Sequence, residues 1–433
     1  MFDSTFIANP YPTYQQLLAR GRTHWVDYMG GAWLVPHYAD VQALLRDPRL
    51  SAERAGMFAA QFGPDERDSL HEMICSFHLS LVFTDGERHL RQRRLLNKAF
   101  TPRVVENLRP AIQQLADQLI DAMLIQARDS GRIELMHQFA HPLPALVISQ
   151  LLGVPASDQA LFMRWSNDLA AFMGNAKSTL AMALQAQQSF GALLNYFRGV
   201  IAQRRAQPRD DFLSQLISAE ERGDVLSEAE LLVQAVLLLT AGHETTRNLI
   251  GNGMQALLQH PDQLALLQRN PSLMRGALDE MLRYNSPLQS IPRIATEDFE
   301  LHGATIQRGQ IVLLLPGAAH WDPAQFAQPE RFDITRQGAR PLAFGHGAHV
   351  CLGMPLAYLE GEIAVRTLLR RLPKLRLVNA TPDWSPNFQL RGLRSLPLSF
   401  GPAAAGTVSL IDDEPLLAHA VGGAACPYHA QWR

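Results

Sequence analysis

Apolar residues recur at about every third or fourth position through most of the chain, which is the spacing of amphipathic helices. This pattern predicts long helices over residues 104–127, 157–205, 228–259 and 263–284. After Pro292 the pattern changes, because the stretch FELHGATIQRGQIVLLL alternates apolar and polar residues around its glycines, as a β-hairpin does. We therefore expect a mainly α protein with a large helical region and a smaller β-rich region.

One cysteine stands where a glycine-rich loop turns into a helix. In the stretch FGHGAHVCLGMPLA, an amphipathic helix is predicted directly after Cys351. A thiolate there faces unpaired N–H groups and the positive end of the helix dipole, which favour the ionised sulfur that metals bind. Gly345, Gly347 and Gly353 let a flat ligand approach the backbone closely. Without such a context, a lone cysteine is more often a small buried hydrophobe.

The helix predicted over residues 228–259 carries polar residues in the middle of an apolar stretch. The sequence LTAGHETT places a glycine, an acid and two adjacent threonines where they locally destabilise a helix. The Thr245 hydroxyl is placed to bond the carbonyl of Ala241 and, with Gly242, to open or bend the helix. The alternative interpretation is a polar turn that faces solvent.

The spacing Phe344-x-x-Gly347-x-His349-x-Cys351-x-Gly353 resembles the heme-binding signature of the cytochrome P450 family. In that family the cysteine is the axial thiolate of heme iron, so the resemblance implies that Cys351 binds the metal and promotes O–O cleavage. It also implies that His349 contacts a heme propionate and that Phe344, Gly345 and Gly353 belong to the cofactor site. The implied fold buries heme between a long central helix and the cysteine loop.

The polar turn in the long helix matches the same family. Glu244 and Thr245 match its acid-alcohol pair, which relays protons during oxygen activation. Ala241 and Gly242 match the groove in which oxygen binds over the heme. The resemblance therefore favours a catalytic turn over a solvent-facing one.

Three cationic positions also match. Thr84 and Asp85 predict the capped start of a helix, on one face of which His89 and Arg93 lie four residues apart. Such a pair is normally solvated surface. By resemblance, His89, Arg93 and the later Arg293 hold heme propionates.

Glu280 and Arg283 form an E-x-x-R pair on a predicted helix. Pairs of this kind are common on exposed helix faces and stabilise them by only about 0.2–0.5 kcal/mol. Together with Arg331 in the segment PERF, however, they resemble the Glu-Arg-Arg triad of the family, which braces the region under the heme.

The resemblance covers about residues 10–400 and implies a heme-thiolate monooxygenase with heme b as cofactor. Such an enzyme inserts one oxygen atom of O2 into a lipophilic substrate by hydroxylation or epoxidation, and we expect a polyketide-like secondary metabolite. By analogy, Leu238, Ile291 and the polar groups of Gln289 and Ser290 line the substrate pocket. A peroxide-driven peroxygenase, a non-oxygenating heme-thiolate enzyme and a non-enzymatic heme-binding protein are the alternatives.

The chain contains no flavin or nicotinamide module, so electrons must come from another protein. By resemblance, NAD(P)H supplies them through a ferredoxin or flavodoxin with its reductase. Arg91 and Arg94, on the helix face opposite His89 and Arg93, are expected to attract an acidic partner of this kind.

Composition limits the remaining partners and the location. A chain of 433 residues that is 47% hydrophobic can bury a large core, and a formal net charge of −2 without basic clusters argues against nucleic acid binding. The N-terminal segment resembles neither a signal peptide nor a membrane anchor, so we expect a cytoplasmic monomer. Residues 1–400 are expected to form one catalytic domain, and residues 401–433 a C-terminal extension of unknown role.

Overall fold

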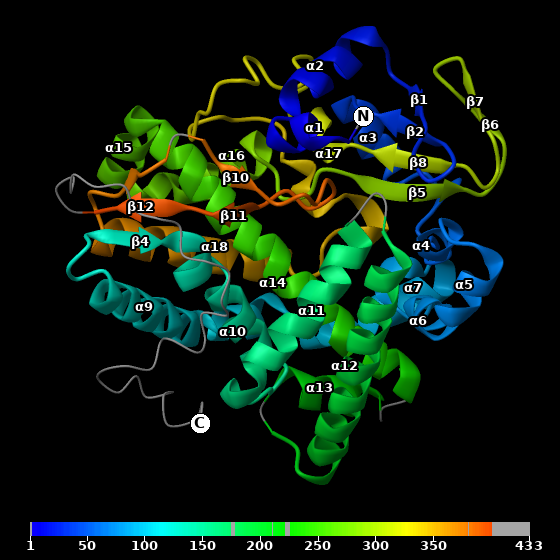
Figure 1. Cartoon of the computed structure of the whole chain (residues 1–433), viewed down its shortest axis with the longest axis horizontal. Helices are drawn as coiled ribbons and strands as arrows, with labels where there is room; N and C mark the ends of the chain where they lie inside the picture. The colour runs from blue at the N-terminus through cyan, green and yellow to red at the C-terminus, as the bar shows by residue number, and fades with distance from the viewer. Residues whose placement is uncertain (1, 175–177, 210, 221–225, 380, 401–433) are drawn as a thin grey trace.

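The computed structural model confirms the mainly α prediction. Helices form most of the chain, and most of the strands gather beside the N-terminal helices (Figure 1). None of the helices within the described ranges is long and apolar enough to cross a lipid bilayer. The predicted C-terminal extension, residues 401–433, lies outside the described residues. The structure describes residues 2–174, 178–209, 211–220, 226–379 and 381–400.

The elements follow one another in a largely helical order. The helices are α1 Ser4–Ala8, α2 Tyr11–Arg20, α3 Tyr38–Leu44, α4 Met57–Ala60, α5 Pro64–Ser69, α6 His71–Phe77, α7 Gly86–Ala99, α8 Pro102–Asn107, α9 Arg109–Gln126, α10 Pro142–Leu151, α11 Gln159–Gly174, α12 Leu180–Ala206, α13 Phe212–Glu220, α14 Glu228–Gln259, α15 Pro261–Arg269, α16 Met274–Tyr284, α17 Pro316–Ala319 and α18 Met354–Arg371. The strands are β1 His24–Val26, β2 Ala32–Val35, β3 Leu50–Ser51, β4 Arg132–Glu134, β5 Ile291–Ala295, β6 Phe299–Leu301, β7 Ala304–Ile306, β8 Ile311–Leu314, β9 Arg376–Leu377, β10 Asp383–Trp384, β11 Leu393–Ser395 and β12 Pro397–Ser399.

The long helix α14 matches its predicted range because its start is specified locally. The Ser227 hydroxyl accepts from the Glu230 N–H at 3.2 Å, and the Glu230 carboxylate accepts from the Ser227 N–H at 2.9 Å. The helix predicted over residues 263–284 is instead two helices, α15 and α16, since Pro271 between them cannot donate the N–H that a continuous helix needs. The other two long predictions are likewise divided, into α8 and α9 and into α11 and α12.

The β-rich region is built around a five-stranded sheet with the strand order β1-β2-β8-β5-β3. Strands β2 and β8 are parallel, and the other neighbours are antiparallel. The predicted hairpin forms between β6 and β7, where Phe299 lies opposite Ile306. Strand β8, which is buried along its whole length, joins the larger sheet instead of extending this hairpin.

Helix α14 runs through the middle of the helical region (Figure 1). Two of its glycines allow close packing: a Cβ on Gly251 would lie 2.4 Å from the sulfur of Met136, and one on Gly253 would lie 2.6 Å from that of Met281. Larger side chains at these positions would collide with packed neighbours. The glycine pattern of this helix therefore serves packing against the surrounding segments.

Candidate functional site

The polar turn of α14 interrupts a buried helix. Ala241 is exposed, although Leu239 and His243 on either side are buried. The Thr245 hydroxyl donates to the Ala241 carbonyl oxygen at 3.0 Å, which confirms the predicted hydrogen bond. On the packed side, a Cβ on Gly242 would lie 3.1 Å from Ile148, so α10 approaches the helix at this glycine. The helix stays continuous through this turn, which combines a side-chain bond to the Ala241 carbonyl with an exposed apolar face.

Glu244 points away from this hydrogen bond toward Arg247. Its Oε2 lies 3.2 Å from Nη1 of Arg247, whose Nη2 also donates to the carbonyl oxygen of Leu393 at 3.2 Å. Both charged side chains also line a cleft of about 240 Å³ between α11, α14 and the segment 385–387. The carboxylate therefore lies at the border of the cleft, one residue from Thr245 in the chain.

The cysteine loop is folded by two short 3₁₀ turns, Leu342–Phe344 and Gly347–His349. Gly345 and Gly347 adopt positive φ angles of 70° and 77°, which side chains other than glycine rarely tolerate. The Cys351 N–H donates to the Phe344 carbonyl oxygen at 2.8 Å and closes the loop. Helix α18 then begins at Met354, as the sequence predicts.

The Cys351 sulfur lies at the start of α18 and is exposed on one side. Desolvation by the surrounding protein raises the pKa of the Cys351 thiol, whereas the N–H groups of Gly353 and Met354 and the Arg93 guanidinium act to lower it. Backbone donors and a cation around one sulfur fit a thiolate that ligates a metal ion, because a coordinated thiol loses its proton.

The predicted propionate contacts come together beside this loop. The rings of His89 and His349 lie 4.0 Å apart between centroids, and Arg93 Nη1 donates to the Val350 carbonyl oxygen at 2.5 Å. Arg293 is buried on β5. Arg54, which no motif indicated, joins these residues through its interaction with Arg293. We call Arg54, His89, Arg93, Arg293 and His349, together with Asp85, the cationic cluster.

Asp85 has a different task from the one that its sequence position predicts. It precedes α7 but makes no side-chain cap hydrogen bond. Its carboxylate instead accepts from the Ser51 hydroxyl at 2.6 Å, the Ala52 N–H at 2.7 Å and His349 Nε2 at 2.9 Å. Burial acts to raise the pKa of Asp85, but the bonds from His349, Ser51 and Ala52 outweigh it and lower that pKa. Asp85 thus orients His349, a role that its position before a helix did not predict.

The cationic cluster contains hydrogen-bond donors that have no acceptor among the described residues, as expected of a site that binds carboxylates. Burial and the nearby charges of His349 and Arg93 lower the pKa of His89 to about 4, and its buried Nε2 has no partner among the described residues. Burial also lowers the pKa of Arg293 to about 10. Unpaired buried donors are costly. The propionates of heme b are acceptors of the required charge, so the residues present fit this cofactor.

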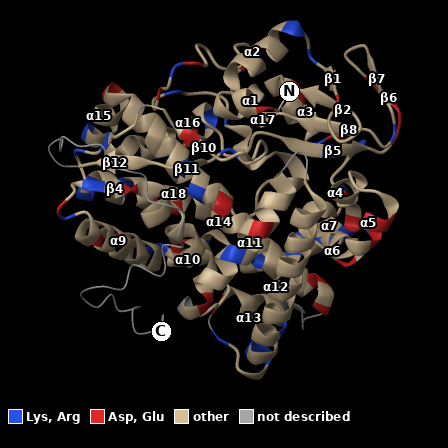
Figure 2. Cartoon of the chain, viewed as in Figure 1, with Lys and Arg blue, Asp and Glu red and all other residues tan. Residues whose placement is uncertain are grey.

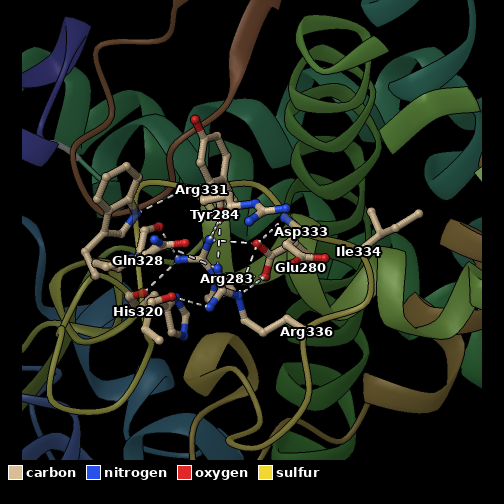
Figure 3. Close-up of polar contacts among 12 residues, drawn as sticks. Glu280, Arg283, Tyr284, His320, Gln328, Arg331, Asp333, Ile334 and Arg336 are labelled. Carbon is tan, nitrogen blue, oxygen red and sulfur yellow. Dashed lines mark hydrogen bonds and ion pairs between the residues drawn. The ribbon is translucent and has the colours of Figure 1, made fainter. Parts of the chain in front are cut away.

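Glu280 and Arg283 form a buried network rather than a surface pair (Figure 3). Arg283 Nε and Nη2 each donate to the Glu280 carboxylate at 2.8 Å, and Nη1 donates to the carbonyl oxygens of His320 and Pro329. The second arginine on Glu280 is Arg336, whose Nε lies 3.2 Å from Oε2.

The predicted third member of the triad, Arg331, is therefore wrong as a side-chain partner. It contributes its backbone carbonyl oxygen, which accepts from Arg283 Nη2 at 3.1 Å, while the residue itself is exposed. Directly after the PERF segment, Asp333 donates its N–H to Glu280 Oε1 at 2.8 Å. The network joins α16 to the segment that precedes the cysteine loop (Figure 3).

The two polar residues expected in the substrate pocket are both buried, and one of them, Gln289, is bonded elsewhere. Gln289 is buried, where its Oε1 accepts from the Tyr14 hydroxyl at 2.7 Å and its Nε2 donates to the Ser286 carbonyl oxygen at 2.7 Å. Ser290 is also buried. Leu238 and Ile291 remain partly exposed, which leaves an apolar lining at these positions.

His320 links the Glu280 network to the cysteine loop and predicts a pH effect on stability. Its Nε2 accepts from the Leu342 N–H at 2.7 Å, and burial lowers its pKa to about 3. As the pH falls, the histidine of the unfolded chain, with a pKa of about 6.5, is protonated before that of the folded chain. The stability present above pH 6.5 is therefore lost as the pH falls toward 3. We expect His320 to lower the unfolding free energy by about 1 kcal/mol between pH 7.5 and 5.5.

The variant His320→Gln isolates this effect, because the glutamine oxygen can accept from Leu342 but does not titrate. Urea unfolding at both pH values should show a smaller pH-dependent loss in the variant than in the parent protein. Other buried histidines contribute equally to both proteins. Equal losses would contradict the role of His320.

The chain is similar to proteins of known family over most of its length. The cytochrome P450 family model matches residues 64–385. The chain is 44% identical over 403 residues to the cytochrome P450 monooxygenase PikC of Streptomyces venezuelae, covering 91% of each. It is 39% identical over 371 residues to the polyketide biosynthesis cytochrome P450 PksS of Bacillus subtilis, covering 85% of this chain and 89% of PksS. A solved structure of P450BioI in complex with an acyl carrier protein superposes with a TM-score of 0.84 at 35% identity, covering 92% of this chain and 99% of that one.

These matches include the segments that carry the chemistry. The range of the family model contains the polar turn of α14, the Glu280 network and the cysteine loop. The relatives align along most of their own length and most of this chain, so the likeness extends over the whole fold. The protein therefore belongs to the cytochrome P450 family and is a heme-thiolate monooxygenase.

Proposed function

We propose that Cys351 is the thiolate that ligates heme iron and that Glu244 and Thr245 deliver the protons of the reaction. Bound heme supplies the centre at which O2 is activated. The observation that carries the proposal is the Thr245 hydrogen bond to Ala241 at the exposed turn of an otherwise buried helix. At that turn a carboxylate and a hydroxyl lie beside an exposed small residue in an otherwise apolar helix, although both side chains are weaker helix formers than the leucines around them.

The loop and four members of the cationic cluster hold the cofactor in this proposal. Gly353 and Met354 N–H groups stabilise the Cys351 thiolate, and Phe344, Gly345 and Gly353 border the heme on the cysteine side. Ala241 and Gly242 border the other face. The propionates are bound by His89, Arg93, Arg293 and His349. Asp85 fixes the orientation of His349 through their 2.9 Å bond.

Glu244 moves protons between solvent and Thr245. The cleft beside Glu244 and Arg247 also carries the polar side chains of Asn167, Ser385 and Asn387, which suit water. A carboxylate on a rotatable stem can exchange its ion pair with Arg247 for a contact toward Thr245. The Thr245 hydroxyl then holds the proton at the turn that borders the substrate.

The substrate is proposed to be a lipophilic molecule of the polyketide class, hydroxylated or epoxidised at one carbon centre. PksS supports this class, because it is named for polyketide biosynthesis. Another relative, 38% identical over 405 residues, is a 6-deoxyerythronolide B hydroxylase of Saccharopolyspora erythraea. The acyl carrier protein seen with P450BioI makes a carrier-bound substrate a second form to test. The apolar side chains of Leu238 and Ile291 suit either form.

The electron donor is proposed to be NAD(P)H acting through a ferredoxin or flavodoxin with its reductase. The predicted docking pair needs revision, because Arg91 Nη2 donates to Glu230 Oε1 at 2.6 Å and its charge is balanced within the molecule. Arg94 stays in the proposal. Along the ribbon, positions of Lys or Arg and of Asp or Glu are interspersed, and acidic positions gather on α5 (Figure 2).

We also propose that residues 1–400 form one catalytic domain of a monomeric, cytoplasmic enzyme. The main hydrophobic cluster supports a single domain, since it includes residues from Phe6 near the start to Leu398 near the end of the described chain.

Thr245→Ala and Glu244→Gln test proton delivery. Each variant should consume NAD(P)H with the electron partners present but form roughly 10²-fold less product, because positioned proton donors contribute about that much. Oxygen that is not protonated in the correct place should leave as hydrogen peroxide. The measurement is the ratio of product and peroxide to NAD(P)H consumed.

Thr246→Ala is the matched control. Thr246 is buried, and its hydroxyl donates to the Gly242 carbonyl oxygen at 3.3 Å, so it resembles Thr245 chemically but faces the packed side. Its product ratio should stay near that of the parent protein. Equal behaviour of the two threonine variants would refute the relay, and full turnover of the parent protein with peroxide alone would favour a peroxygenase instead.

A further inference from the structure

Arg54 is a cation that neither the motifs nor the proposed mechanism uses. It lies between β3 and α4, where Nη1 donates to the carbonyl oxygens of Ala52 at 3.0 Å and Val82 at 2.9 Å. Its guanidinium carbon stands 4.7 Å from the centroid of the Phe83 ring. Its Nε is buried and has no partner among the described residues. A buried guanidinium N–H without an acceptor is costly, so an acceptor group beside Nε would stabilise this arrangement.

The cationic cluster around Arg54 is unbalanced in charge. Burial lowers the pKa of Arg54 to about 9, with a further contribution from Arg293, so the side chain stays charged at neutral pH. Arg93 and Arg293 add two more guanidinium groups, and Asp85 is the carboxylate that acts on this cluster. Asp85 already accepts from a hydroxyl, a backbone N–H and an imidazole. Two positive charges therefore lack a partner within the cluster.

We propose that Arg54 binds a carboxylate of the cofactor together with Arg293, and so governs how tightly the chain holds heme and how readily its iron is reduced. The inference rests on the heme site proposed above. The two propionates of heme b match the two unbalanced charges. Arg54 is a positioning residue here, because it acts at the edge of the cofactor and not on the reacting atoms.

The test compares Arg54→Gln and Arg54→Lys with Arg49→Gln. Arg49 is the matched control, since it is bonded to Asp47 at 2.6 Å, lies over Phe299 and stands outside the cationic cluster. Two quantities are measured on the heme-loaded proteins without substrate. The first is the rate of heme transfer to excess apomyoglobin, and the second is the reduction potential of the iron.

We expect Arg54→Gln to lose heme about tenfold faster than the parent protein, the effect of one charge-assisted hydrogen bond. Its reduction potential should become more negative, because a positive charge near the iron favours the added electron. Arg54→Lys keeps the charge but not the two-pronged geometry, so its potential should stay near that of the parent protein while heme loss is faster. Arg49→Gln should change neither quantity.

Several outcomes would overturn the inference. The first is that the Arg54 variants have the same rate of heme loss and the same reduction potential as Arg49→Gln. If Arg54→Gln is not recovered folded, a rate of heme loss in Arg54→Lys equal to that of Arg49→Gln would overturn the inference. A second outcome is that Arg54→Gln retains heme normally and still binds the methyl ester of a long-chain fatty acid but no longer binds the free acid. This result would assign Arg54 to a substrate carboxylate. A parent protein that binds no heme would instead refute the proposed function itself.

Discussion

Cys351→Ser is expected to lack the strongly red-shifted Soret band that we expect the reduced parent protein to give with carbon monoxide, and to lower oxygenation to background. The backbone N–H groups of Gly353 and Met354 and the glycine turns of the loop would remain, so the change is confined to the donor atom. A serine oxygen is a far weaker electron donor to iron than a thiolate. Absorption spectra with and without carbon monoxide, followed by product analysis, check the prediction.

Cys75→Ser serves as the control for this experiment. Cys75 is exposed on α6, with its sulfur 3.3 Å from Nε2 of His71, so the substitution removes a thiol without touching the cysteine loop. Its spectrum and turnover should match those of the parent protein. A red-shifted band that persists in Cys351→Ser would mean that the thiolate ligand is not Cys351.

Arg283→Ala is expected to destabilise the folded protein by about 3–5 kcal/mol, the usual effect of breaking a buried ion pair from one side. The variant would leave Glu280 charged and buried, and the carbonyl oxygens of His320 and Pro329 without their donor. Because His320 also supports the first turn of the cysteine loop, heme loading should fall together with stability. Urea unfolding and heme content per chain measure the two effects.

Arg275→Ala on the same helix is the control, because it shows how much the replacement of an exposed arginine of α16 by alanine changes the unfolding free energy. Arg275 is exposed and lies 3.4 Å from Asp279, an i,i+4 surface pair of the kind that contributes at most about 1 kcal/mol. The unfolding free energy of this variant should therefore stay close to that of the parent protein. A loss in Arg283→Ala no larger than in Arg275→Ala would show that the buried network does not brace the loop.

Features that depend on local sequence could be predicted, and those that depend on distant pairing could not. The start of α14 was readable because Ser227 and Glu230 satisfy each other within one turn. The task of Asp85 was hidden, because its partners Ser51 and His349 are 34 and 264 residues away in the chain. A carboxylate before a helix is a good cap candidate until the fold supplies stronger donors.

The same limit explains the two arginines that motifs missed or misassigned. The PERF segment suggested Arg331 for the triad, but the chain turns after it and brings Arg336 to Glu280. Arg54 belongs to no pattern, and only its burial beside Arg293 marks it. Charge balance in a buried cluster is a property of the folded chain, which spacing along the sequence does not encode.

The glycines of α14 also divide this helix mechanically. Its second half is closely packed, because Gly251 and Gly253 let the sulfur atoms of Met136 and Met281 lie against the helix backbone. This packing opposes a sideways shift of that half of the helix. The turn at Ala241, one face of which is exposed and whose carbonyl is bonded by Thr245, has no such restraint on that face. A bend in α14 would therefore be easier at the turn around Ala241 than in the half that contains Gly251 and Gly253, and it would couple the shape of a bound molecule to the position of the Thr245 hydroxyl.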